Sequence, residues 1–120
     1  MKDYKLTNSE MKFAELIWAN EPLASMELVK LSEQELGWKK STTFTFLKTL
    51  CDKGIFINDN AMVSTVMSKD DLIGKQSRHY VEDTFGGSLP KFITSFMGGD
   101  KLSDKQAKEL MRLIEAHKED

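Results

Sequence analysis

The sequence predicts a mainly α-helical fold with a small β-hairpin, because its hydrophobic pattern changes twice along the chain. Apolar residues recur at helical spacing over residues 6–53, and two short β-rich runs separated by a polar turn occupy residues 55–67. Helical spacing then returns over residues 69–118, with a break at Gly86-Gly87-Ser88. We therefore expect three helices, a hairpin and three further helices.

The first helix is expected to begin near Asn8 and to end at Asn20. Thr7 and Glu10 are three residues apart, which is the spacing of a capping box. The apolar residues of the helix form a wide stripe: Met11, Phe13, Ala14, Leu16, Ile17 and Trp18. Because this stripe is too wide for a lone surface helix, we expect the helix to pack against two neighbours.

A second helix is expected from Ser25, a residue type that caps helix N-termini, to about Leu36. Leu28 and Val29 would face inward. Gly37 would end the helix, because glycine readily adopts the left-handed conformation found after a last helical turn.

The third helix is expected over about residues 39–53, stopping at Gly54. At about 100° per residue, one of its faces is apolar and the other polar. The apolar face comprises Thr43, Phe46, Leu47 and Leu50. The polar face comprises Ser41, Thr45 and Lys48. Such a helix can pack on one side and offer hydroxyls and ammoniums to phosphates and base edges on the other.

The hairpin would pair Ile55-Phe56-Ile57 with residues 62–67 across a turn at Asn58-Asp59-Asn60. Three helices followed by a hairpin form a winged helix-turn-helix domain, whose third helix enters the major groove of DNA. We expect this DNA-binding domain to span residues 1–68.

Six residues at the third helix are the predicted contacts with double-stranded DNA: Lys39, Lys40, Ser41, Thr42, Thr45 and Lys48. Thr42, in the first turn, is the strongest candidate for contact with a base or a phosphate, since its hydroxyl can hydrogen-bond and its methyl can touch a thymine. The lysines would contact phosphates and fix the register of the helix on the duplex. The alternative interpretation is an ordinary solvated helix face.

Residues 69–120 are expected to form a helical dimerisation domain, with helices at about 69–85, 89–97 and 104–118 and Ser103 capping the last. Six apolar residues are the predicted dimer contacts: Leu89, Phe92, Ile93, Phe96, Leu110 and Ile114. With Leu102, Ala107 and Met111 they form more apolar surface than three short helices can cover by themselves. A self-complementary surface of this kind favours a two-fold homodimer.

The charge and hydropathy of the chain indicate whether it binds nucleic acid or associates with a membrane. The formal net charge is −2, from 17 basic and 19 acidic residues, so total charge does not indicate nucleic acid. Local charge does, because four lysines and one acidic residue lie between Lys39 and Lys53. No segment resembles a signal peptide or a membrane span of roughly 20 apolar residues, so we expect a cytoplasmic protein that does not associate with membranes.

The single cysteine, Cys51, excludes an internal disulfide framework and a multi-cysteine metal cluster. On a helix beside Leu47 and Leu50 it is expected to be a buried, unreactive thiol, with a redox sensor as the alternative. His79 and His117 show no ligand spacing, and no nucleophile, base or carboxylate pair lies at a usable spacing. We therefore expect neither a metal site, nor a cofactor, nor enzymatic activity.

Several motifs occur in a fixed order along nearly the whole chain: Leu6-Thr7-Asn8-Ser9-Glu10, Ile17-Trp18, Trp38, Ser41-Thr42, Leu47, Leu50, Lys53-Gly54, Phe85-Gly86-Gly87-Ser88-Leu89, Phe96 and Leu102-Ser103. In this order and spacing the sequence resembles the penicillinase-repressor family of winged-helix regulators, which includes BlaI, MecI and CopY. The resemblance implies a homodimeric repressor that sits on a dyad operator and blocks transcription.

The resemblance leaves the releasing signal open. In the antibiotic-responsive branch a membrane sensor triggers cleavage of an Asn-Phe bond in the dimerisation tail, where this chain has Ser95-Phe96. In the copper-responsive branch paired Cys-x-Cys motifs lie at the C-terminus, and this chain has none. The resemblance therefore identifies neither the inducing signal nor a sensor or protease partner.

A second hypothesis is a winged-helix adaptor that binds proteins and has lost DNA readout. Residues 58–62 of the expected hairpin motivate it, because they carry one negative charge and no positive charge, whereas the resemblance implies basic and aromatic residues there. Titration against random duplex at low and moderate salt separates the two hypotheses, since DNA binding weakens with salt as counterions are released.

Overall fold

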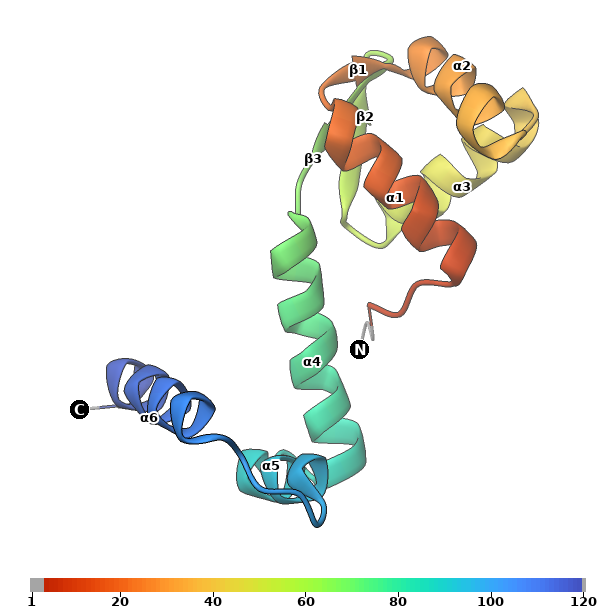
Figure 1. Ribbon diagram of the computed structural model, residues 1–120. Coiled ribbons are helices and arrows are strands. Elements are labelled where there is room, and N and C mark those ends of the chain that lie inside the picture. The colour runs from red at the N-terminus through yellow and green to blue at the C-terminus, as the bar shows by residue number, and fades with distance from the viewer. Residues whose placement is uncertain (1–3, 120) are drawn as a thin grey trace. The chain divides into compact units, whose positions relative to one another are not determined.

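The computed structural model describes residues 4–119, which contain six helices and a three-stranded antiparallel sheet (Figure 1). In chain order the elements are α1 (Asn8–Asn20), β1 (Leu23–Ala24), α2 (Ser25–Leu36), α3 (Lys40–Asp52), β2 (Phe56–Asp59), β3 (Met62–Thr65), α4 (Lys69–Phe85), α5 (Leu89–Met97) and α6 (Asp104–His117). The predicted fold class is confirmed. Contacts divide the chain into two compact units, and the division falls within α4, after Tyr80.

The start of α1 is fixed by the predicted capping box. Thr7 Oγ1 accepts a hydrogen bond from the backbone N–H of Glu10 at 3.1 Å, and Glu10 Oε1 accepts one from the N–H of Thr7 at 2.8 Å. Two backbone donors that the first turn leaves unpaired are thereby satisfied. The helix begins at Asn8 for this reason.

The predicted N-cap of α2 is wrong by one residue. Ala24 is the N-cap, and Ser25 is the first helical residue, buried, with its backbone N–H bonded to the carbonyl of Ala61 at 2.8 Å. The chain enters α2 directly from a strand, and the carbonyl of Ala61 in the hairpin turn satisfies one of the backbone N–H groups that the first helical turn leaves without a partner. Gly37 ends the helix as predicted, with φ at +69°.

The sheet has the strand order β1-β3-β2, and β1 is a short strand that the sequence pattern did not predict. Leu23 pairs with Val63, and Asp59 at the end of β2 pairs with Met62 at the start of β3. The hairpin turn therefore consists of residues 60 and 61, both at positive φ. The predicted turn at residues 58–60 is wrong in position, because residues 58 and 59 pair within the sheet.

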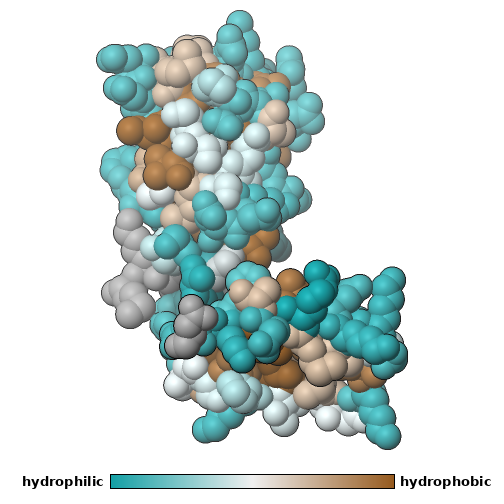
Figure 2. All heavy atoms as spheres, turned by 90° about the vertical axis from the view of Figure 1, so that its left-hand side faces the viewer, coloured by the Kyte–Doolittle hydropathy of each residue, from teal (hydrophilic) through white to brown (hydrophobic). Residues whose placement is uncertain are grey.

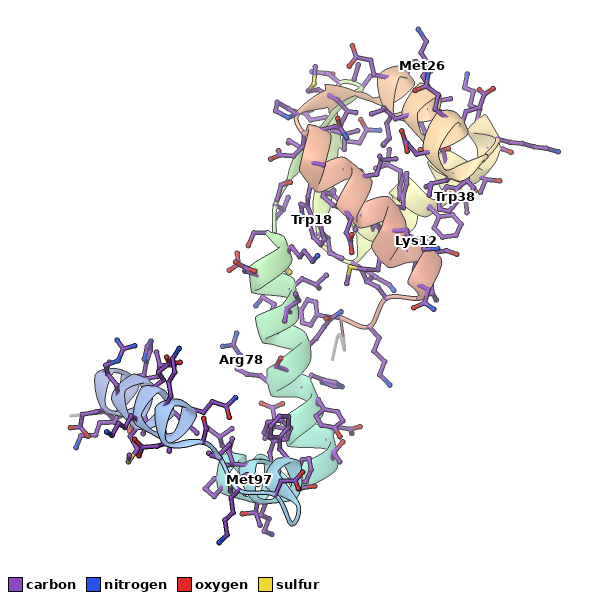
Figure 3. All side chains as sticks on the ribbon, in the orientation of Figure 1. Lys12, Trp18, Met26, Trp38, Arg78 and Met97 are labelled. Carbon is purple, nitrogen blue, oxygen red and sulfur yellow. The ribbon has the colours of Figure 1, made fainter. Side chains whose placement is uncertain are left out.

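The core of the N-terminal unit is built around α1. Phe13, Ala14 and Ile17 are completely buried, and α1 packs against α2, α3 and β3, which confirms that its wide stripe needs more than one neighbour. Both tryptophans have structural positions (Figure 3). The ring of Trp38 lies 4.3 Å from that of Phe46 and 5.2 Å from that of Phe13, between centroids.

The C-terminal unit follows the predicted helix boundaries closely. Ser88 and Ser103 cap α5 and α6, their hydroxyls accepting hydrogen bonds from the backbone N–H groups of Lys91 and Gln106. The last helix ends at His117, one residue before the predicted end. Neither α5 nor α6 contains a buried residue.

Candidate nucleic-acid interface

Helix α3 has the two faces that its sequence predicts. Thr43, Leu47 and Leu50 have 0%, 2% and 0% of their surface exposed, and Phe46 is half-buried. The predicted DNA contacts lie on the solvent side of the helix, and we name them together the α3 ridge: Lys39, Lys40, Ser41, Thr42, Thr45 and Lys48. Thr42 is half-buried and the other five are exposed. Five of the six residues are therefore accessible to solvent, and Thr42 is partly accessible.

The N-terminal end of α3 is electrostatically suited to an anion. Lys39 is the N-cap, no side chain caps the helix, and its first turn contains no acidic residue. The backbone N–H groups of a first turn lack partners within the helix and carry a partial positive charge. Together with the ammoniums of Lys39 and Lys40, they form a surface at which a phosphate oxygen would be stabilised.

The hydroxyl of Thr45 is oriented by its own helix. It donates a hydrogen bond to the carbonyl of Ser41 at 3.0 Å. One turn further on, Thr49 makes the same bond to the carbonyl of Thr45 at 3.1 Å. Since the proton of Thr45 is used within the helix, its oxygen points outward as an acceptor, and the amino groups of adenine and cytosine are the matching donors in the major groove.

Lys48 forms an ion pair with Asp52, one turn further along α3. The distance from Nζ to Oδ2 is 3.0 Å, and the two side chains are 78% and 67% exposed. An exposed pair of this kind contributes little to stability, so the ammonium can exchange the carboxylate for a phosphate at little cost.

Lys53, which contributed to the predicted cluster of positive charge, lies away from the α3 ridge. Its Nζ is bonded to the carbonyl of Lys5 at 2.9 Å and lies 3.4 Å from Oε2 of Glu10. Burial raises the pKa of the Glu10 carboxyl, but the hydrogen bond from Thr7 and the charge of Lys53 outweigh burial and hold this pKa below its ordinary value. Lys53 therefore has a structural role.

The hairpin presents apolar and acidic side chains. Ile57, Met62 and Val66 are 48%, 46% and 61% exposed, and residues 55–67 contain Asp59 and no lysine or arginine. Strong attraction of a phosphate to this hairpin is not expected from its side chains.

An apolar groove of about 540 Å³ lies between α3 and the hairpin, and sequence reasoning did not predict it. Its lining includes Phe44, Cys51, Ile57 and Val66. Phe44 is half-buried and packs against the hydrophobic core. Cys51 is half-buried too, and burial together with the nearby charge of Asp52 raises the pKa of its thiol, which disfavours the reactive thiolate.

The predicted dimer contacts lie on the C-terminal helices with much of their surface uncovered. Leu89, Phe96 and Ile114 are 56%, 74% and 56% exposed, whereas Phe92, Ile93 and Leu110 are half-buried. On the face drawn in Figure 2, hydrophobic side chains emerge between hydrophilic ones in the lower part of the view, where these helices lie. Leu113, 50% exposed on α6, is a further apolar residue that the prediction omitted.

Residues 4–119 contain neither a candidate metal site nor a membrane-spanning helix. No group of three or more His, Cys, Asp or Glu in this part of the chain could hold a metal ion. None of its helices combines the length and the apolar character that a bilayer span requires.

Comparison with known proteins identifies the family. The sequence profile of the family described as Penicillinase repressor matches residues 6–116. This chain is also similar to the penicillinase repressor of Bacillus licheniformis, with 22% identity over 118 residues that cover 95% of this chain and 92% of the relative. Both matches include the N-terminal winged helix and the C-terminal helices. This chain therefore belongs to the penicillinase repressor family.

Proposed function

We propose that this protein is a homodimeric repressor of transcription that binds a dyad operator through the α3 ridge. The observation that carries the proposal is the construction of α3 itself, whose apolar face is buried in the core while Ser41, Thr45 and Lys48 are exposed. Membership in a family of repressors, which are regulators and not enzymes, supports the same function.

The lysines and the threonines of the α3 ridge would have different roles in DNA recognition. Lys39, Lys40 and Lys48 would neutralise phosphates, and each phosphate neutralised contributes about 0.9 to the slope of log affinity against log salt. Thr42 and Thr45 would contact base edges in the major groove. Backbone contacts position a protein on DNA, whereas base contacts select the sequence.

Dimerisation would supply the two-fold symmetry that a dyad operator requires. In this proposal residues 1–68 bind DNA and residues 69–120 join the two copies. The exposed apolar residues of α5 and α6 support the second role, because two copies would cover them. The cytoplasm is where we expect the protein to act, since its operator would be there.

Replacement of Thr42 and Lys48 by alanine tests the proposal directly. We expect the double variant to bind DNA from upstream of its own gene at least about tenfold more weakly and to show a shallower salt dependence, since one lysine contact is lost per copy. Lys105→Ala, which removes an equally exposed lysine from α6, is the matched control. Circular dichroism and thermal unfolding verify that each variant is folded.

Two outcomes would contradict the proposal. If the double variant binds as tightly as the wild type, then α3 does not read the operator. If the wild type binds neither this fragment nor random duplex at low and moderate salt, the adaptor hypothesis is favoured instead.

A further inference from the structure

Residues 4–6, which we name the strap, are held by side chains from two other parts of the N-terminal unit. The backbone carbonyl of Tyr4 accepts a hydrogen bond from Nε2 of Gln76 on α4 at 2.7 Å. The next carbonyl, that of Lys5, accepts one from Nζ of Lys53, the C-cap of α3, at 2.9 Å. Two consecutive carbonyls of the strap therefore connect the end of α3 to α4.

The strap is held in one conformation by its packing against the N-terminal unit. Tyr4 and Leu6 both pack against the hydrophobic core, and the ammonium of Lys75 lies 5.5 Å from the centroid of the Tyr4 ring. The φ angle of Tyr4 is +58°. A bulky residue is uncommon in this left-handed region, and it stays there only where its surroundings determine the conformation.

Helix α4 has little hydrophobic attachment of its own. Leu72 is its one buried residue, and all seventeen residues of the helix are among those described. Near its start, the indole Nε1 of Trp18 donates to the carbonyl of Met67 at 3.1 Å, and Nζ of Lys69 lies 3.6 Å from Oε1 of Glu15. These contacts hold the start of α4, and the burial of Leu72 holds the turn that follows.

Gln76 supplies a hydrogen-bonded attachment one turn beyond Leu72. It follows Leu72 by four residues, which places it on the same face of α4 and about 6 Å further along the axis. Its bond to the strap is therefore the second of two points that define a direction for the helix.

We propose that Gln76 is a positioning residue for operator binding. By bonding to the strap it fixes the direction of α4 on the N-terminal unit, and α4 continues into the helices that join the dimer. The two recognition helices are then held at one separation, and the dimer binds half-sites of one spacing. This inference rests on the proposed dimeric repressor, and it adds the residue that sets its spacing.

The test compares half-site spacings for the full-length protein. The wild type first selects a dyad duplex from a random pool. Three duplexes are then titrated: the selected dyad, the same half-sites separated by about 5 additional base pairs, which is half a helical turn, and a single half-site. Gln76→Leu removes the donor at similar volume, and Ser77→Ala, an exposed neighbour on α4, is the matched control.

We expect Gln76→Leu to bind the selected dyad about three- to tenfold more weakly than the wild type, which is the effect of one hydrogen bond. The ratio of its affinity for the selected dyad to its affinity for the widened dyad should fall by the same factor. Affinity for the single half-site should stay within about twofold of the wild type, because α3 itself is unchanged. Gln76→Asn, whose amide is too short to reach the strap, should behave in the same way, whereas Ser77→Ala should match the wild type.

Three results would overturn the inference. If both Gln76 variants keep the wild-type preference for spacing, then Gln76 does not position the dimer. If they lose half-site affinity as much as dyad affinity, their effect is general damage to the N-terminal unit. If the wild type enriches no duplex at all, the proposed function fails and this inference fails with it.

Discussion

Apolar side chains are buried in the N-terminal unit and largely exposed on the C-terminal helices. Phe13, Ile17 and Leu28 of the first unit are completely buried. Neither α5 nor α6 contains a buried residue, and Phe96 is 74% exposed. The first unit therefore encloses its own hydrophobic core, whereas the C-terminal helices leave apolar surface that a second copy could cover.

Separating the two regions should produce the largest effect. We expect a fragment of residues 1–80 to unfold cooperatively as a monomer, because it keeps the whole core with Leu72, which is completely buried. A fragment of residues 81–120 should show little helix at low concentration, since isolated helices this short are marginal in water. Circular dichroism during urea unfolding measures both.

Urea unfolding of a shorter fragment tests where the hydrophobic core of the N-terminal unit ends. A fragment of residues 1–68 lacks Leu72 and should be less stable than residues 1–80 by about 2–5 kcal/mol, the usual cost of removing a buried leucine side chain. A monomeric, fully helical fragment of residues 81–120 would contradict the comparison.

A charge on the exposed apolar surface of α6 should have the next largest effect. We expect Ile114→Glu to weaken dimerisation about 30- to 1,000-fold, because an unpaired carboxylate at an interface costs about 2–4 kcal/mol. Sedimentation equilibrium measures the dissociation constant, and Lys105→Glu is the control for added negative charge on the same helix. Equal dimerisation by Ile114→Glu and the wild type would exclude α6 from the interface.

Acidic pH should affect the N-terminal unit through Glu10. Its pKa lies below the ordinary value of 4.5, so the carboxylate stabilises the fold above about pH 4.5 and this contribution is lost as the pH falls through the lowered pKa. Glu10→Gln keeps an acceptor for Thr7 but removes the charge facing Lys53. We expect it to cost about 1 kcal/mol of unfolding free energy at pH 7.

Urea unfolding at several pH values from 3 to 7 measures this effect. The wild type and Glu10→Gln should converge at the acidic end, whereas Glu27→Gln, which alters an exposed carboxylate on α2, should follow the wild type throughout. A constant difference between wild type and Glu10→Gln would show that charge is not its cause.

A gain of stability of similar size is expected in the same core. The hydroxyl of Thr43 is buried without a hydrogen-bond partner. Thr43→Val has nearly the same shape and should raise the unfolding free energy by about 1 kcal/mol, with DNA affinity unchanged. Thermal unfolding measures it against Thr45→Val, whose hydroxyl is exposed and bonded. A loss of stability in Thr43→Val would show that the hydroxyl is satisfied after all.

The helix boundaries could be predicted because the groups that determine them are local. Thr7 caps α1 through Glu10, Gly37 ends α2, and Ser103 caps α6, all within a few residues of the ends that they fix. The exposed position of the α3 ridge followed in the same way from the helical period. Such features depend on short-range sequence alone.

The features that escaped prediction depend on contacts between distant residues. Strand β1 has two residues, too few to show a period, and it exists because Leu23 pairs with Val63. Pairing within this sheet also explains why the cap of α2 and the hairpin turn lie at other residues than predicted. Lys53 was counted with the positive cluster because its partner Glu10 lies 43 residues earlier in the chain. No local signal indicates such partners.

The ion pair on α3 bears on how the protein would discriminate among the many duplexes of a genome. Any duplex that approaches Lys48 must compete with a carboxylate that the ammonium already holds. Every DNA sequence offers phosphates, and an exposed ion pair costs little to break, so Lys48 would contribute about equally on all duplexes and leave selection to the contacts with base edges. Preference for the operator over the many other sites of a genome would then depend on Thr42 and Thr45, which are the proposed base contacts.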